Sequence, residues 1–364
     1  MLNIKLCNIA IKVLACISLL LFSLTSLSTQ AAPVKAAFVL VGPANYVGWS
    51  YSHDQGRQYL EQKFGTNIET EFVEFVAEGR ASRKVLQELA SRNDIVFSTS
   101  IGYMVPTAGI AKENPTVMFE HATGTRQGKN LTTYATRAYQ PRYLSGLIAG
   151  SMTKTNKVGY VAAHPIPEVI RGINAFTLGV REANPNAVVE VEWTKSWYNP
   201  KKETALAEKL VAAGVDVLTH HTDSSAVVEL AEKKGIQVIG YHSDMSEFAP
   251  KQHLASVVHN WGPYYEQRIQ ALLEGNWKAG NEWSGLAEQT SLLVSISKSL
   301  PADVKKLVLE KQAALVSGQL KVFSGPIKNH RGRVRIKQDH GLTDEKLLRM
   351  SWYVEGVTGS LLSF

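Results

Sequence analysis

The segment AAFVLVG, residues 36–42, sets the interpretation of the rest of the chain. It is a short apolar run that ends in Gly42-Pro43, which is typical of a buried parallel strand running into a loop. Segments with helical or strand spacing follow it in order at 51–64, 68–76, 80–91, 94–99 and 116–120. This alternation of strand and helix predicts a mostly parallel α/β sheet flanked by helices.

The same pattern starts again further along the chain. A long helix is expected at 139–153, and KVGYVA at 157–162 is a new first strand. Alternating helices and strands then continue at 168–183, 188–193, 201–213, 216–220, 225–234 and 236–241. The sequence therefore predicts two α/β lobes of similar construction.

The lobe boundaries follow from this restart. We expect the first lobe at 32–154 and the second at 155–254, with hinges near 153–157 and 241–256. The remaining residues do not form a third set of strands and helices. Part of 255–300 is expected to complete the first lobe and part of 300–364 the second, with a hairpin near 321–336.

Residues 1–31 have the layout of a secretory signal peptide. Lys5 and Lys12 precede an apolar run at 13–24, and small residues lead to a cleavage site near Ala31. This layout predicts export to the periplasm. One alternative is an uncleaved membrane anchor. Another is lipid attachment at Cys16, which is less favoured because a dozen apolar or small residues follow Cys16.

The composition excludes several classes of protein. The chain has 364 residues, 45% of them hydrophobic and 20% charged, which is ordinary for a soluble protein of two domains. Its 39 basic and 32 acidic residues are scattered, so nucleic-acid binding is not expected. Cys7 and Cys16 are its only cysteines, and a cut near Ala31 removes both, which leaves no disulfide and no thiolate metal site.

Catalytic and cofactor motifs are incomplete. Residues 124–129 resemble a phosphate-binding loop, but Asn130 stands where Ser or Thr is required. No G-x-S-x-G elbow occurs, and the adjacency of His, Asp and Ser at 220–225 is no evidence for a triad, since triads are assembled by folding. Clustered His and Asp lack metal-ligand spacing. We therefore predict no enzyme activity, metal or cofactor.

The loops after the predicted strands favour a ligand site instead, because open parallel sheets bind ligands at the carboxyl ends of their strands. Trp49 and Trp197 occupy such loops in different lobes and predict a slot for a flat heterocycle, although both could instead be anchors buried against their own helices. Aspartates are suited to accept N–H groups of a purine edge. Asp54 and Asp223 could alternatively cap the helices that follow them. The candidate ligand-binding residues are Trp49, Tyr51, Asp54, Tyr103, Trp197, Asp223, His242, Asp244 and Asn260.

Several motifs in the same order resemble one family. They are AFVLVGP at 37–43, GWSY at 48–51, DQG at 54–56, YLSGLIAG at 143–150, VGYV at 158–161, GINAF at 172–176, GYHSD at 240–244 and SGQLKVF at 317–323. Together they resemble the basic membrane protein family, the purine nucleoside receptor type of ABC-transporter substrate-binding proteins. The resemblance extends over about residues 36–330.

This resemblance implies a two-lobed type I periplasmic-binding-protein fold with several hinge crossovers. It implies that the lobes close on a purine and deliver it to a permease in the inner membrane. We expect the protein to be a monomer. Trp49 and Trp197 would replace the family's stacking phenylalanines.

Two departures from the family bear on the ligand. Its Asp-Ser-Asp-Gln run reads HSDM at 242–245, and its lysine is replaced near His259-Asn260. Because that Asp and Lys help to bind nucleosides, a nucleobase such as adenine or guanine is favoured. An exported enzyme acting on nucleosides or a related heterocycle, and a ligand sensor, remain alternatives.

Overall fold

The computed structural model describes residues 32–44 and 46–361. All described helices and strands lie in Val34–Phe364, the larger of two compact units of the chain. The predicted signal peptide, with Cys7 and Cys16, falls outside the described residues. No helix in the described part is long and apolar enough to cross a membrane.

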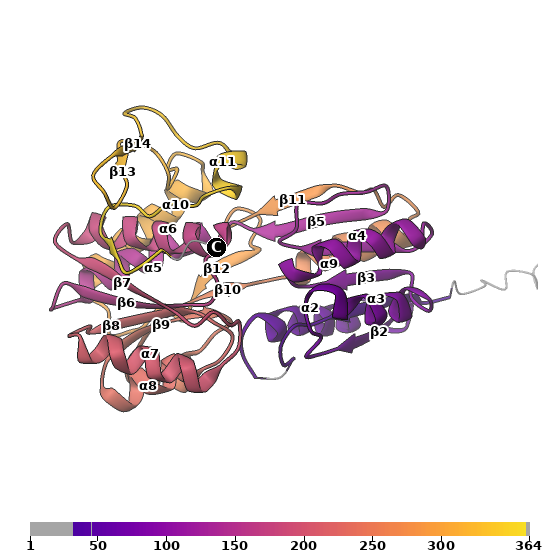
Figure 1. Ribbon diagram of the computed structural model, residues 1–364, viewed down its shortest axis with the longest axis horizontal. Coiled ribbons are helices and arrows are strands. Elements are labelled where there is room, and N and C mark those ends of the chain that lie inside the picture. The colour runs from indigo at the N-terminus through magenta and orange to yellow at the C-terminus, as the bar shows by residue number, and fades with distance from the viewer. Residues whose placement is uncertain (1–31, 45, 362–364) are drawn as a thin grey trace, which may run out of the picture. The chain divides into compact units, whose positions relative to one another are not determined.

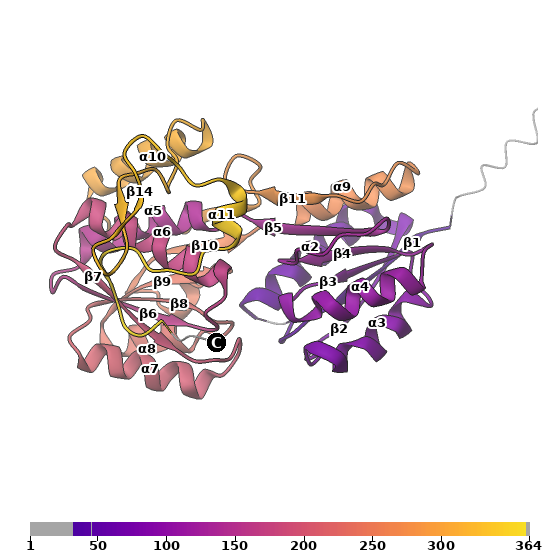
Figure 2. The ribbon, with the colours of Figure 1, turned by 45° about the horizontal axis from the view of Figure 1, so that its top comes forward.

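The first lobe is built on a six-stranded sheet in which every pairing is parallel (Figure 1). Its strands, in spatial order, are β11 (Asn281–Ser284), β5 (Leu131–Thr136), β4 (Met118–Ala122), β3 (Ile95–Ser98), β1 (Val34–Val39) and β2 (Ile68–Val73). Helices α2 (Trp49–Phe64) and α9 (Gly262–Leu273) cover one face, and α3 (Ser82–Ala90) and α4 (Met104–Glu113) the other (Figure 2). Short 3-10 helices lie at Gly65–Asn67, Gly79–Ala81 and Ile101–Tyr103.

The second lobe contains a seven-stranded sheet that is parallel except for one edge strand, β12. Its strands, in spatial order, are β12 (Ser291–Val294), β10 (His253–His259), β9 (Gln237–His242), β8 (Val217–His221), β6 (Lys157–Ala162), β7 (Val188–Trp193) and β15 (Val357–Thr358). The helices of one face are α5 (Tyr139–Met152), α6 (Pro167–Ala183) and α10 (Ala302–Val316), and those of the other are α7 (Pro200–Ala212) and α8 (Ala226–Lys234). A 3-10 helix lies at Ser246–Phe248.

Strand β1 shows why the run at 36–42 is apolar throughout. Successive side chains of a strand point to opposite faces of the sheet. Phe38 packs in one core with Tyr265 of α9, and Val39 packs in another with Leu86 of α3. Because helices cover both faces, neither set of side chains meets solvent, as in other parallel sheets.

The chain crosses between the lobes three times, at 137–138, 260–261 and 285–290. The hinges that we expected at 153–157 and 241–256 lie instead inside the second lobe. Helix α5, placed by the sequence in the first lobe, packs against α6, and β10 pairs with β9. Helical spacing shows that α5 has an apolar face but does not identify the sheet on which that face packs.

Close backbone contact explains why α5 stays with α6. A Cβ atom on Gly146 would lie 2.1 Å from the carbonyl oxygen of Phe176, and one on Gly150 would lie 2.2 Å from that of Val180. On the opposing helix, a Cβ on Gly179 would lie 2.1 Å from the carbonyl oxygen of Tyr143. Only glycine allows the two helices to approach so closely.

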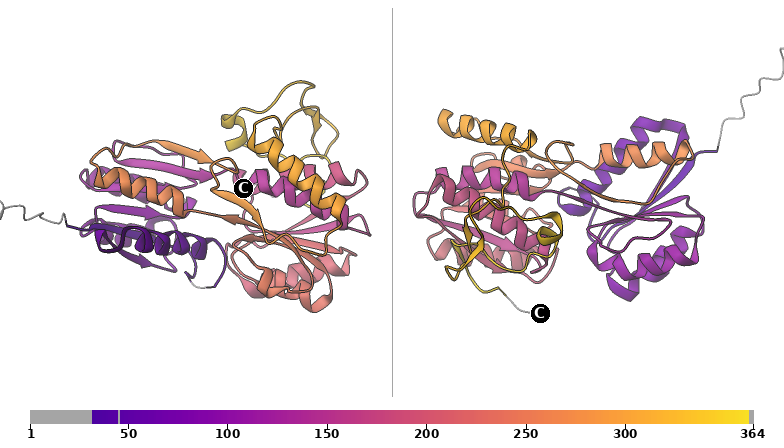
Figure 3. Two further views of the ribbon diagram at one scale, coloured as in Figure 1. Left: turned by 180° about the vertical axis from the view of Figure 1, so that it is seen from behind. Right: turned by 90° about the horizontal axis from the view of Figure 1, so that it is seen from above.

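The C-terminal segment lies against the second lobe (Figure 3). It forms the predicted hairpin from β13 (Ile327–Lys328) and β14 (Val334–Ile336), which pair antiparallel. Helix α11 (Asp344–Leu348) then contacts α6, and β15 extends the second sheet beside β7. The Asp344 carboxylate binds the Arg137 guanidinium at 2.6 Å, next to the first crossover.

Candidate ligand-binding site

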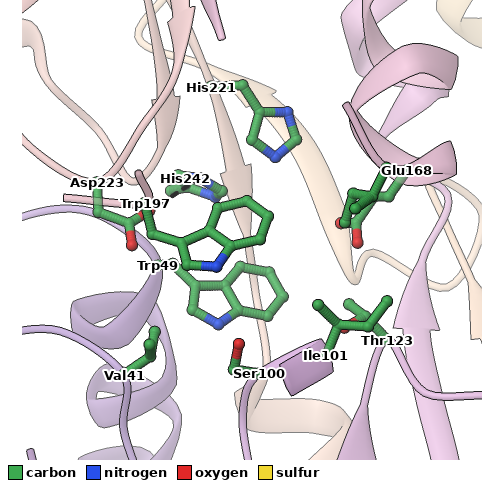
Figure 4. A pocket seen from close by; sticks show the side chains of 11 residues that line it. Val41, Trp49, Ser100, Ile101, Thr123, Glu168, Trp197, His221, Asp223 and His242 are labelled. Atoms are coloured by element: carbon green, nitrogen blue, oxygen red, sulfur yellow. Dashed lines mark ion pairs between the residues drawn. The ribbon is translucent and has the colours of Figure 1, made fainter. Parts of the chain in front are cut away.

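A narrow cavity of about 30 Å³ lies between the two lobes, beside the carboxyl ends of their strands. Its position agrees with the general rule for ligand sites in open parallel sheets. Both lobes contribute lining residues (Figure 4). They are Val41, Trp49, Ser100, Ile101, Thr123, Ile166, Glu168, Trp197, His221, Asp223 and His242.

Trp49 is the first residue of α2, rather than a loop residue as the sequence suggested. Its indole Nε1–H donates to the carbonyl oxygen of Thr99 at 2.5 Å. The rings of His53 and Trp261 meet it edge-on, with centroids 4.5 and 5.5 Å away. These contacts fix the indole from behind and leave it lining the cavity.

Gly48 brings the start of α2 directly against the second lobe. Its backbone N–H donates to Ser243 Oγ at 3.1 Å, and a Cβ atom at this position would lie 2.3 Å from the Asp223 carbonyl oxygen. Its φ of 96° also belongs to a region that residues with a Cβ rarely occupy. Any other residue at 48 would separate the two lobes at this contact.

Trp197 supplies the second indole from the loop between β7 and α7. It is half-buried, and its ring lies 4.7 Å from that of His164. The Asp223 backbone N–H donates to the Trp197 carbonyl oxygen at 2.9 Å, which joins the two loops. The cavity is thus lined by one indole from each lobe, as Figure 4 shows.

Asp223 and His242 place unpaired polar atoms in the cavity wall. Asp223 Oδ1 lies 3.3 Å from His242 Nε2, and both side chains are buried. Within the described chain neither atom has a hydrogen-bond partner, nor does His221 Nδ1. Buried polar atoms are usually paired, so the two unpaired atoms of Asp223 and His242 are typical of a site that awaits a polar partner.

Burial controls the ionisation of these groups. It raises the pKa of Asp223 well above the usual value, with a further rise from the nearby Glu203 charge, while a hydrogen bond from the Trp49 backbone acts in the opposite direction. Burial and the neighbouring His221 hold the pKa of His242 well below its ordinary value. Both histidines are therefore neutral near pH 7.

Glu168 is a lining residue that sequence reasoning did not select. It stands in the first turn of α6 directly after Pro167, and Figure 4 shows it on the opposite side of the indole rings from Asp223. Burial raises its pKa, and the nearby Arg171 counteracts this rise. The sequence feature that could have identified Glu168 is a glutamate directly after a proline, at the point where a strand is followed by a helix.

Three candidates from the first lobe lie outside the cavity. Tyr51 and Asp54 are inside α2, which begins earlier than expected. The Asp54 carboxylate binds Arg57 at 2.6 Å, so it neither faces the cavity nor caps the helix. The Tyr103 hydroxyl donates to the Val76 carbonyl oxygen at 2.6 Å, and its ring belongs to the core under α3 and α4.

Two candidates from the second lobe and the crossover also lie elsewhere. Asp244 is exposed, and its carboxylate accepts hydrogen bonds from the Ser295 hydroxyl and the Ser246 backbone. Asn260 donates to the Gln289 carbonyl oxygen at 3.0 Å. The sequence identifies these residues as polar and places them in loops, but it does not determine the direction in which their side chains point. Of the nine candidates, Trp49, Trp197, Asp223 and His242 line the cavity.

A second cavity of about 400 Å³ adjoins the first and shares Ile101, Thr123, Ile166 and Glu168 with it. It extends past Arg171 to Arg349, next to α11. Among the described residues no group of three His, Cys, Asp or Glu is arranged to hold a metal ion.

Comparison with known proteins connects this geometry to a family. Residues 33–324 match the family described as ABC transporter substrate-binding protein PnrA-like. The chain is 43% identical to a purine-binding protein of Brucella abortus over 90% of this chain and 94% of that protein. It is 34% identical, over 92% of this chain and 83% of the other, to a Haloferax volcanii protein that carries the name of an ABC-transporter glucose-binding protein.

Solved structures show the same architecture. A solute-binding protein of an ABC transporter system from Aeropyrum pernix matches with a TM-score of 0.70 at 18% identity, covering 81% of this chain and 94% of that one. At this identity the likeness shows the fold alone. It confirms the predicted two-lobed type I periplasmic-binding-protein fold.

Proposed function

We propose that this chain, which belongs to the PnrA-like family of ABC transporter substrate-binding proteins, captures a purine between its lobes. The resemblance to the basic membrane protein family is thereby confirmed. Such proteins bind a small molecule outside the cytoplasm and pass it to a permease. For this chain we propose the periplasm, a monomer released by cleavage near Ala31, and a permease in the inner membrane.

One observation carries the choice of ligand class. Asp223 Oδ1 and His242 Nε2 are buried and unpaired, and both residues line one cavity together with two indole rings. Leaving such atoms unpaired costs about 1 to 3 kcal/mol each, which a ligand with polar atoms on its edge would recover. A flat heterocycle that carries donors and acceptors around its rim fits both the rings and the polar atoms.

The indoles are suited to hold the faces of that heterocycle. Stacking of a base on an aromatic side chain contributes about 1 to 3 kcal/mol. Since Trp49 belongs to the first lobe and Trp197 to the second, a stacked ligand would draw the lobes together. The alternative, that each tryptophan is only an anchor of its own lobe, predicts no loss of affinity on its removal.

A free nucleobase is proposed in preference to a nucleoside. The sequence lacks the Asp and Lys that the family uses to bind nucleosides, and HSDM stands at 242–245. A nucleoside would need to place its sugar in the adjoining cavity near Glu168 and Arg171. Adenine and guanine are therefore expected to bind more tightly than adenosine and guanosine.

Titration calorimetry tests the proposal with adenine, guanine, adenosine, guanosine and glucose, glucose being included because of the name of the Haloferax relative. The expected result is tightest binding of a nucleobase. Binding of glucose with no purine binding would overturn the ligand class. Mass spectrometry of adenosine after incubation with the protein tests the enzyme alternative, since the carboxylates of Asp223 and Glu168 line the cavity. Unchanged adenosine is expected.

A further inference from the structure

A row of hydrogen bonds lies behind His242, outside the cavity. The Thr136 hydroxyl is 3.0 Å from His259 Nδ1, and His259 Nε2 is 3.2 Å from His242 Nδ1. The other nitrogen of His242, Nε2, faces Asp223 Oδ1. Thr136, His259 and His242 are all buried. The row therefore leads from Thr136, which does not line the cavity, to His242, which does.

Thr136 and His259 hold special places in the fold. Thr136 ends β5 and His259 ends β10, so each directly precedes a crossover between the lobes. The His259 ring lies parallel to the Trp261 ring and meets the Trp49 ring edge-on, with centroids 5.4 and 5.0 Å away. Packing against both indoles holds the imidazole in the orientation that the two hydrogen bonds require.

Each imidazole of the row carries one N–H. Burial and the Arg142 charge lower the pKa of His259 to about 3. Burial, His221, His259, His220 and Arg142 hold the pKa of His242 low as well. In a hydrogen bond between two neutral imidazoles, one nitrogen must donate and the other must accept. The row can thus have only two directions, and all of its members must share the same one.

The hydroxyl of Thr136 selects the direction. In the described part of the chain, Thr136 Oγ1 has no hydrogen-bond partner besides His259 Nδ1. If His259 donated to it, the hydroxyl hydrogen would be buried without an acceptor, which is costly. The hydroxyl therefore donates to His259 Nδ1, His259 Nε2–H donates to His242 Nδ1, and the proton of His242 is on Nε2.

We propose that Thr136 and His259 are positioning residues that fix His242 as a hydrogen-bond donor into the cavity, beside the acceptor Asp223 Oδ1. The cavity then selects a ligand edge on which an acceptor atom lies next to an N–H donor. Adenine offers this pair twice, since its exocyclic amine is flanked by N1 and N7. The consequence for the ligand depends on the proposed function, whereas the direction of the row does not.

Nuclear magnetic resonance tests the direction in protein to which no ligand has been added. Ring nitrogen shifts of ¹⁵N-histidine distinguish the Nε2–H from the Nδ1–H form, and difference spectra of His242→Gln and His259→Gln assign the signals. Both residues are expected in the Nε2–H form. Thr136→Val should move His242 toward the Nδ1–H form, and Thr136→Ser should restore the parent signals.

Thr133→Val is the matched control, because Thr133 is on the same strand but pairs with Asn281. It should leave the His242 signal unchanged. An Nδ1–H His242 in the parent, or a His242 signal that Thr136→Val does not move, would overturn the proposal.

Calorimetry with adenine, 1-deazaadenine and 7-deazaadenine tests the consequence for recognition. His242 faces either N1 or N7 of bound adenine. The deaza analogue that lacks the nitrogen facing His242 should bind at least about tenfold more weakly than adenine. Thr136→Val should reduce that ratio at least about threefold, and Thr133→Val should not. An unchanged ratio in Thr136→Val contradicts the positioning role. If no purine binds, the proposed function fails, and the resonance data still decide the direction of the row.

Discussion

The two lobes contribute different chemistry to the cavity. The first lobe supplies one indole, aliphatic side chains and hydroxyls, from Val41, Trp49, Ser100, Ile101 and Thr123. The second lobe supplies every ionisable group that lines it, namely Glu168, His221, Asp223 and His242. Its remaining contributions are Ile166 and Trp197.

This difference suggests a division of labour that follows from physical chemistry. Ionisable groups recognise the polar edge of a ligand only where they are held rigidly and kept from water. Here they are held by one lobe, so their mutual geometry does not depend on closure. The first lobe adds a ring face and encloses the site. Recognition of the edge is thus expected to reside in the second lobe, and enclosure in the first.

The strongest test is to remove the acceptor of the second lobe. Asp223→Ala leaves a ligand N–H without a partner in a dry cavity, so we expect purine affinity to fall about 30- to 150-fold, or about 2 to 3 kcal/mol. Calorimetry measures this loss. Asp244→Ala is the matched control, since its carboxylate is exposed and bound to Ser295. Equal effects of the two substitutions would argue against the assigned roles.

The two tryptophans test the comparison between the lobes directly, because each lobe supplies one of them. Trp197→Ala removes a stacking face and should weaken binding by about 1 to 2 kcal/mol, roughly 5- to 30-fold. Trp49→Ala should have a similar effect on binding but also lower the melting temperature, because its indole packs on His53 and Trp261. Calorimetry and thermal unfolding separate the two effects. Tyr198→Ala, an exposed neighbour of Trp197, serves as the control.

Acid should weaken binding through the second lobe. The raised pKa of ligand-free Asp223 means that falling pH protonates it, and a protonated carboxyl is a poorer acceptor for a ligand N–H. Affinity is expected to be highest above that pKa and to fall below it by at most about tenfold per pH unit, since one proton is involved. Calorimetry in buffers of different ionisation enthalpy should detect proton release on binding. A pH-independent affinity would mean that Asp223 does not accept from the ligand.

The smallest effect is expected where sequence reasoning misplaced a residue. Asp54 binds Arg57, and Asn260 binds the Gln289 carbonyl, both away from the cavity. Asp54→Ala and Asn260→Ala should therefore change purine affinity less than about threefold. Asp54→Ala should lower stability by about 1 to 3 kcal/mol, because its buried carboxylate pairs with Arg57 and Gln58. Calorimetry with thermal unfolding distinguishes the two. A tenfold loss of affinity in either variant would show that the substituted residue contributes to the binding site.

Sequence patterns predicted the elements well for a specific reason. Several strands between 34 and 242 contain an apolar run bounded by a loop, as VGYVA at 158–162 shows, and others alternate, as VVEVEW at 188–193 shows. Two elements in this range were not predicted. Strand β5 reads LTTYAT, and three of its residues are threonines, while α4 begins in a segment that resembled a loop. Neither has the continuous apolar run or the clear helical spacing on which the prediction depended.

The site was predictable only in part, because a loop position does not determine where a side chain points. Asp223 and Asp244 both follow strands of the second lobe, yet one faces the cavity and the other faces Ser295. Trp49 and Trp197 were predicted because tryptophan is rare in loops, although Trp49 proves to be the first residue of α2. The partnership of Thr136 with His259 joins residues 123 positions apart and has no local signature. Contacts of this kind arise only when the crossovers bring β5 and β10 together.

The glycine contacts between α5 and α6 influence how variation in this sequence is tolerated. Helix α5 starts just after the first crossover, and α6 carries Glu168 in its first turn. Gly146 and Gly179 allow the two backbones to touch, and any larger residue would displace one helix from the other. A replacement there would move Glu168 relative to the crossover without altering a cavity residue. We therefore expect substitutions at positions that never contact the ligand to alter ligand preference. A mutational screen confined to the residues that line the cavity would miss them.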